Sequence, residues 1–102
     1  MSAQWTSIEA AAALVQDHHQ VVMSAGNERP PMALLRQIVR QGTTGLRAVG
    51  VVGGEINLDF LVGAGAADVI DTCSVTLGPF ARTGPNFARH VTAGRITAMD
   101  NT

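Results

Sequence analysis

The sequence contains no lysine and a single cysteine, and the single cysteine excludes a disulfide bond within the chain. All seven basic residues are arginines, against eight acidic residues, so the formal net charge is −1. The arginines form no cluster, which argues against nucleic acid as the main partner. Cys73 cannot form an internal disulfide, and this composition fits a reducing compartment. Because no activating neighbour is visible in the sequence, we expect Cys73 to be a buried, inert thiol.

Long apolar runs and a secretory leader are also missing. The apolar runs fall well short of the ~18 residues that a membrane helix needs. The first residues lack the basic segment and apolar core of a signal peptide. We therefore expect a soluble, cytoplasmic protein that does not insert into a membrane. Apolar residues still make up 46% of the 102 residues, so we expect residues 1–102 to form a single domain with a modest core.

Helix signals alternate with short apolar segments along the chain. The S/T-x-x-E pattern at residues 6–9 predicts the start of a helix, and residues 20–23 predict a strand. Pro30 or Pro31 suits the first turn of the next helix, which Gly42 would end in a left-handed conformation. The remaining expected elements are a strand at 46–52, a short helix capped by Asn57, a strand at 69–75, a helix from about Phe87 to Gly94 and a strand at 95–99.

This alternation predicts an α/β fold, with an open, mostly parallel sheet, flanking helices and right-handed crossovers. Residues 46–52 are almost entirely apolar, so we expect this strand to be buried on both faces. The last expected strand comes at the end of the sequence. It would leave a sheet edge for something else to cover, so we expect an incomplete or partnered sheet.

Three loops follow expected strands and would meet where open α/β sheets bind ligands, at the carboxyl ends of the strands. They are residues 24–29, 53–57 and 76–82. Ser24, Ala25 and Gly26 allow a backbone to approach a ligand, and the next helix points its positive end at the same place. The alternative is an ordinary turn with solvated charges. Gly53 and Gly54 leave the same choice between ligand approach and a tight turn.

A glycine pattern, a pair of histidines and two glutamates are weaker indications of a binding or catalytic site. Residues 63–67 imitate a dinucleotide fingerprint, but they lie between a helix and a strand, which is the reverse of the required order. His18 and His19 are adjacent, so their side chains point apart and do not suggest a metal site. Glu28 and Glu55 lie at strand ends and are candidate general bases.

The order of the segments resembles the start of the α subunit of a family I coenzyme A transferase of the glutaconate type, from about Ser7 to Asp100. The resemblance rests on Gly26, Arg29 with Pro31, Arg40-Gln41-Gly42, Gly45-Leu46, Gly53-Gly54-Glu55, Arg89 and Ala93-Gly94. It implies an open α/β sheet. It also implies a ping-pong reaction in which a glutamate carboxylate attacks an acyl-coenzyme A thioester and then passes coenzyme A to a second carboxylic acid.

In two-subunit members of that family the nucleophile lies in an E-x-G turn of the β subunit, and this sequence contains no such turn. The resemblance therefore implies a β-type partner, no catalytic residue in this chain, and a coenzyme A ester as substrate rather than as a bound cofactor. It also implies one wall of the substrate site, formed by Ser24, Gly26, Asn27, Arg29, Gly53 and Gly54. Arg29 would bind an acyl carboxylate, or alternatively pair with Glu28 at the surface.

Several roles remain open. The family's α subunits are more than twice this length, so the chain would be the N-terminal portion of a transferase subunit or a small stand-alone subunit. A subunit of a related coenzyme A ester hydrolase and a non-catalytic assembly subunit are the alternatives. An independent enzyme that uses Glu28 or Glu55 is a further one.

Overall fold

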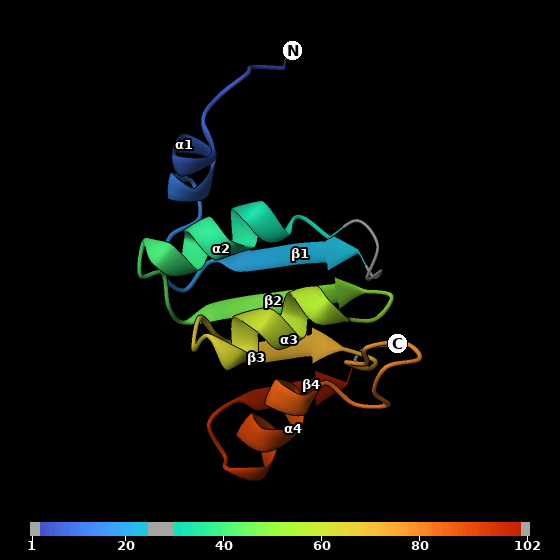
Figure 1. The fold of residues 1–102 in the computed structure, drawn as a ribbon. Helices are drawn as coiled ribbons and strands as arrows, with labels where there is room; N and C mark the ends of the chain where they lie inside the picture. Colours follow the sequence, from blue (N-terminus) through green and yellow to red (C-terminus); the bar gives the residue numbers. More distant parts are fainter. Residues whose placement is uncertain (1–2, 25–29, 101–102) are drawn as a thin grey trace.

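The computed structural model describes residues 3–24 and 30–100, and helices and strands alternate along them (Figure 1). The elements are α1 (Ile8–Ala13), β1 (Gln20–Ser24), α2 (Met32–Arg40), β2 (Leu46–Val51), α3 (Ile56–Gly63), β3 (Ala67–Thr72), α4 (Pro85–Thr92) and β4 (Thr97–Asp100). The strands of the described residues form one sheet in the order β1-β2-β3-β4, and every pair is parallel. The predicted open, parallel α/β fold is confirmed.

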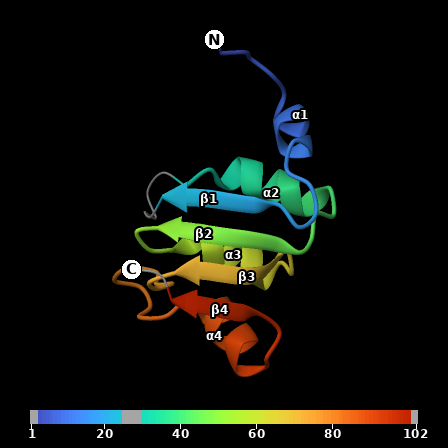
Figure 2. The same cartoon turned by 180° about the vertical axis from the view of Figure 1, so that it is seen from behind.

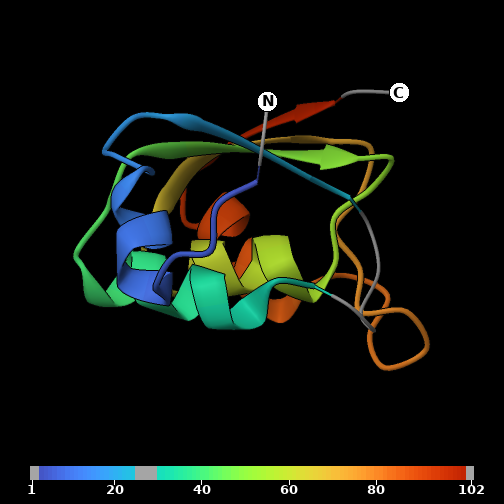
Figure 3. The same cartoon turned by 90° about the horizontal axis from the view of Figure 1, so that it is seen from above.

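All four described helices lie on the same side of this sheet (Figures 1 and 3). The strand order follows the chain, and each crossover between parallel strands is right-handed, so each connecting helix returns over the same face. Seen from behind, the strands lie in front of the helices, and no described helix covers this second face (Figure 2). The described part of the chain therefore forms two layers, with one sheet face left open.

The core lies between the helices and the covered face of the sheet. On α2, Leu35 and Ile38 are buried, as the three-residue spacing predicts. The central helix, α3, contributes Leu58, Leu61 and Val62, each fully buried, because it packs between α2 and α4 over the middle strands. No helix in the described ranges has both the length and the apolar character needed to cross a membrane.

The prediction that residues 46–52 are buried on both faces is wrong. Within β2, Leu46 and Ala48 are fully buried, whereas Val51 is 53% exposed. Arg47 lies on the open face, where its Nη2 forms a 2.6 Å ion pair with Oδ2 of Asp71 on β3. The physical reason is the one-sided placement of the helices, which leaves alternate residues of each strand uncovered.

The observed ends of the helices and strands lie at, or within a few residues of, the ends predicted from the sequence. Ser7, and not Thr6, is the N-cap of α1, and its Oγ accepts a hydrogen bond from Ala10 N at 3.1 Å. Gly42 follows α2 with a φ of +83°, the predicted left-handed stop. Strand β3 begins and ends earlier than predicted, at Ala67–Thr72. Among the described strands, β1 and β4 each have one neighbour and form the two edges of the sheet.

Candidate functional site

The loops after β2 and β3 lie side by side at the carboxyl edge of the sheet. Gly54 and Val75 form a parallel bridge beyond the ends of their strands. In this bridge Gly54 N donates to Ser74 O at 2.8 Å, and Thr76 N donates to Gly54 O at 3.0 Å. The expected convergence of these two loops is therefore observed, and it is fixed by backbone hydrogen bonds.

The end of β1 is tied to the same place by Asn57, a buried residue of α3. Its Nδ2 donates to Ser24 O at 3.2 Å, while its Oδ1 accepts from Glu55 N at 3.1 Å and from Leu58 N at 2.8 Å. The prediction that Asn57 caps the helix is wrong, because Glu55 is the N-cap and Asn57 is the second helical residue. Its amide instead satisfies the backbone of two neighbouring loops, which brings Ser24 next to the turn before α3.

Half of the predicted substrate-binding residues can be placed at this edge. Ser24 is exposed at the end of β1, Gly53 is half-buried after β2, and Gly54 is buried beside it. Outside the described residues lie Gly26, Asn27 and Arg29, together with the candidate base Glu28. The other candidate base, Glu55, is half-buried at the start of α3.

Close packing explains why position 54 is occupied by glycine. A β-carbon at this position would overlap the side chain of Leu58, which is fully buried in α3. At Gly53 a β-carbon would meet Ser74 Oγ at 3.2 Å, a tight contact with an exposed side chain. Close packing against Leu58, which is neither ligand approach nor a tight turn, therefore accounts for Gly54, whereas the surroundings of Gly53 are more open.

Sequence reasoning missed a polar run at the end of β3. The strand ends at Thr72, so Cys73 and Ser74 lie at the carboxyl edge and are exposed. The prediction of a buried Cys73 is wrong: the strand ends one residue before it, which leaves the thiol exposed at this edge. The Cys73 thiol donates to Val52 O, with an Sγ–O distance of 2.9 Å. The available signal was the change from apolar to hydroxyl-bearing residues after position 70.

Residues 76–82, the third of the loops predicted to lie at this edge, belong to the connection between β3 and α4 and form a compact turn. Its base is held by Gly84 N, which donates to Val75 O at 2.9 Å, and its turn by Leu77 N, which donates to Ala81 O at 3.0 Å. The tip exposes Phe80, whose side chain is 85% accessible. This loop therefore brings an apolar tip to the edge of the sheet.

The buried carboxylate of Asp59 serves the fold. Asp59 is 4% exposed, and its oxygens accept from Phe87 N at 2.8 Å and from Asn86 Nδ2 at 3.0 Å, which ties α3 to the first turn of α4.

His18 and His19 precede β1 and therefore lie at the opposite, amino edge. Within residues 3–24 and 30–100, no group of three or more His, Cys, Asp or Glu side chains is placed to hold a metal ion.

Comparison with solved structures finds the same fold in a coenzyme A-transferase and in a decarboxylase. Glutaconate coenzyme A-transferase from Acidaminococcus fermentans matches with a TM-score of 0.83 and 24% identity, over 95% of this chain and 31% of that chain. A variant of the decarboxylase AibA/AibB matches with a TM-score of 0.82 and 23% identity, over 97% of this chain and 38% of that chain. No protein-family model and no curated protein matches the chain.

The likeness to these structures defines the class of fold. Both matches cover nearly the whole of this chain, so its described residues have a coenzyme A transferase-like fold. The chain spans less than two fifths of each of those chains, at 31% and 38% of their lengths. At such low identity, the activity has to be argued from the site itself.

Proposed function

We propose that this chain is the N-terminal portion of an α-type subunit of a coenzyme A transferase, which moves coenzyme A between carboxylic acids. The observation that carries the proposal is the match of 95% of the chain to glutaconate coenzyme A-transferase. It is supported by the colinear segments of the sequence, and by the position of Ser24, Gly53 and Gly54 at the carboxyl edge of the sheet. Open α/β sheets bind their ligands at that edge.

In the proposed reaction, a glutamate of a β-type partner is the nucleophile. Its carboxylate oxygen attacks the thioester carbonyl, coenzyme A leaves as a thiolate, and an anhydride forms. The thiolate then attacks the glutamyl carbonyl of the anhydride and releases the first carboxylate, which leaves a glutamyl thioester on the partner. A second carboxylate reverses these steps and departs as the new coenzyme A ester.

This chain would bind and orient the substrate. The tetrahedral intermediates need hydrogen-bond donors aimed at the developing oxyanion. Gly54 N already donates to Ser74 O, so this N–H is engaged, and we propose that the donors include the Ser24 hydroxyl and groups of residues 25–29 and 53. In this role Gly26 and Asn27 would approach the substrate closely, and Arg29 would pair its guanidinium with the carboxylate of the free acid substrate.

The partner and the setting follow from the same proposal. Because the chain has no E-x-G turn, a β-type subunit has to supply one. One matched protein, the decarboxylase AibA/AibB, is named for two components. Coenzyme A esters would enter as substrates, with no permanently bound cofactor, and the assembly would act in the cytoplasm.

Co-expression with a β-type subunit that carries an E-x-G turn tests this proposal. We expect the two chains to co-purify and to convert an acyl-coenzyme A and a free carboxylic acid into a new coenzyme A ester. The matched control replaces the partner's E-x-G glutamate with glutamine, which should abolish exchange but leave the complex intact. Release of free coenzyme A without a new ester would favour the hydrolase alternative. A chain that remains alone and indifferent to coenzyme A would contradict the proposal and favour a non-catalytic assembly subunit.

A further inference from the structure

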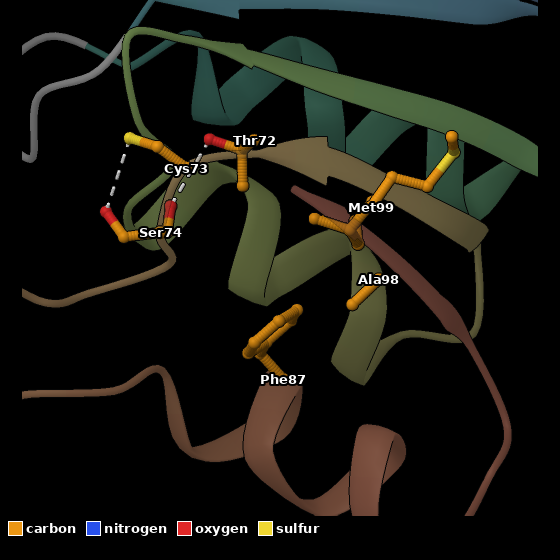
Figure 4. A pocket seen from close by; sticks show the side chains of 7 residues that line it. Thr72, Cys73, Ser74, Phe87, Ala98 and Met99 are labelled. Carbon is orange, nitrogen blue, oxygen red and sulfur yellow. Dashed lines mark hydrogen bonds between the residues drawn. The ribbon is translucent and has the colours of Figure 1, made fainter. Parts of the chain in front are cut away.

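A pocket of about 300 Å³ opens at the carboxyl ends of β3 and β4, between the sheet and α4 (Figure 4). Ile70 and Thr72, which are both buried, are among the residues that line it. Phe87 extends from α4 toward the sheet, and Ala98 of β4 lies across from it (Figure 4). A volume of this size is at the lower end of the range of small-molecule sites, roughly 300–1,000 Å³.

The pocket exists because a small side chain lies where the strand faces the helix layer. Ala98 pairs with Ile70 in the β3–β4 ladder, so it shares the helix-covered face of the sheet with that buried residue. Its methyl group leaves the space in front of Phe87 unfilled. Met99, the next residue, directs its side chain away from Phe87 (Figure 4). A larger side chain at position 98 would close the pocket.

The pocket has one polar end. Thr72 Oγ1 lies 3.3 Å from the carbonyl oxygens of both Gly50 and Ser74, so its proton is already used within the chain. Ser74 Oγ is exposed and lies 3.8 Å from Cys73 Sγ, a weak interaction that a ligand can replace. The Ser74 hydroxyl points toward Cys73 and away from Phe87 (Figure 4), so it would rotate about its Cα–Cβ bond to donate to a carbonyl oxygen of a ligand in the apolar pocket.

The charges around the pocket disfavour an anion. No lining residue is basic. The N–H of Phe87, in the first turn of α4, already donates to the carboxylate of Asp59 at 2.8 Å, and that buried charge offsets the positive end of the helix. A second carboxylate in this pocket would lose its hydration without gaining a cation.

We propose that this pocket binds the acyl chain of the coenzyme A ester and selects short, uncharged chains over chains that end in a carboxylate. The acyl carbons would contact Ile70, Phe87 and Ala98, and the thioester carbonyl would accept a hydrogen bond from Ser74. This inference rests on the proposed transferase function and adds a substrate class to it.

The test is a titration of the isotope-labelled chain, followed by NMR, with two thioesters of N-acetylcysteamine. The butyryl thioester is uncharged, and the glutaryl thioester ends in a carboxylate. We expect saturable shifts at Ile70, Phe87 and Ala98 with the butyryl compound. The glutaryl compound should bind at least about tenfold more weakly, because its carboxylate would be buried without a partner. No partner subunit is needed, so failure here would overturn this inference and leave the exchange assay to decide the proposed function.

The matched variants are Ala98→Phe, which fills the pocket, and Thr97→Phe, which adds the same ring one residue earlier on the opposite face of β4. We expect Ala98→Phe to lose butyryl binding and Thr97→Phe to retain it. Ala98→Leu provides a milder filling if the phenylalanine variant does not fold. Equal binding by the wild type and the filled variant, equal affinity for the two thioesters, or shifts confined to the open face of the sheet would each overturn the proposal.

Discussion

Asp59 is a buried carboxylate whose hydrogen bonds join two helices. It accepts from Phe87 N and Asn86 Nδ2, and it is 4% exposed. Asp59→Ala would leave these donors without their charged acceptor, so we expect a loss of about 1–3 kcal/mol in the free energy of unfolding. Urea unfolding followed by far-UV circular dichroism measures it.

Asp68→Ala is the matched control for this prediction. Asp68 is an exposed residue of β3, and its replacement should change the free energy of unfolding by less than about 0.5 kcal/mol. If both variants unfold at the same urea concentration, the proposed role of Asp59 in holding α4 is wrong.

Gly54 and Gly53 form a second matched pair. Neither has a positive φ, so packing decides what each position tolerates. Gly54→Ala would drive a methyl group into Leu58, and we expect it to cost about 1–3 kcal/mol of stability. Gly53→Ala makes its one tight contact with the exposed Ser74 hydroxyl, at 3.2 Å, and should cost less than about 1 kcal/mol. Thermal unfolding of both variants compares them, and a larger loss at Gly53 would contradict the packing argument.

Single residues were the hardest to predict from the sequence. The two glycines were recognised as special, but their difference depends on Leu58, which packs against only one of them. Asn57 was recognised as a polar residue at a helix start, yet its contact with Ser24 crosses more than thirty residues of sequence. Such long-range contacts leave no local sequence pattern, so they cannot be predicted from helix-capping residues or from hydrophobic periodicity.

At the scale of elements, the sequence signals were strong where the structure is set locally. Gly42 ends α2 in a left-handed conformation, whereas Pro31, predicted with Pro30 for the first turn, is the N-cap directly before the helix. The strand at 69–75 was misplaced because Val75 is apolar and buried, although it pairs with Gly54 outside the sheet. Burial alone therefore does not distinguish a strand end from a loop that packs beneath it.

The one-sided burial of the strands can be tested on β1. Met23 faces the helices and is 9% exposed, whereas Val22 faces the open side and is 58% exposed. We expect Met23→Ala to cost about 2–5 kcal/mol, since it removes buried volume. Val22→Ala should cost no more than about 1 kcal/mol, through β propensity. Chemical denaturation of the two variants measures the difference. Equal losses would mean that both faces of β1 are buried in solution.

At the scale of the whole molecule, the alternation of helices and strands was enough to predict an open parallel sheet. The burial of one face only was not predicted, because it depends on strand order, which apolar periodicity does not reveal. All-parallel sheets are nearly always covered on both faces. The open face, with Val22 and Val51 more than half exposed, is therefore a surface that further protein would cover in the assembly that we propose.

The central claim is that this chain shapes a substrate cleft while the attacking carboxylate comes from another subunit. The most direct measurement incubates the chain and a β-type subunit with an acyl-coenzyme A and determines the intact mass of each polypeptide. We predict a coenzyme A thioester on the partner's E-x-G glutamate and an unmodified mass for this chain. A thioester on Glu28 or Glu55 of this chain, formed with or without the partner, would contradict the account.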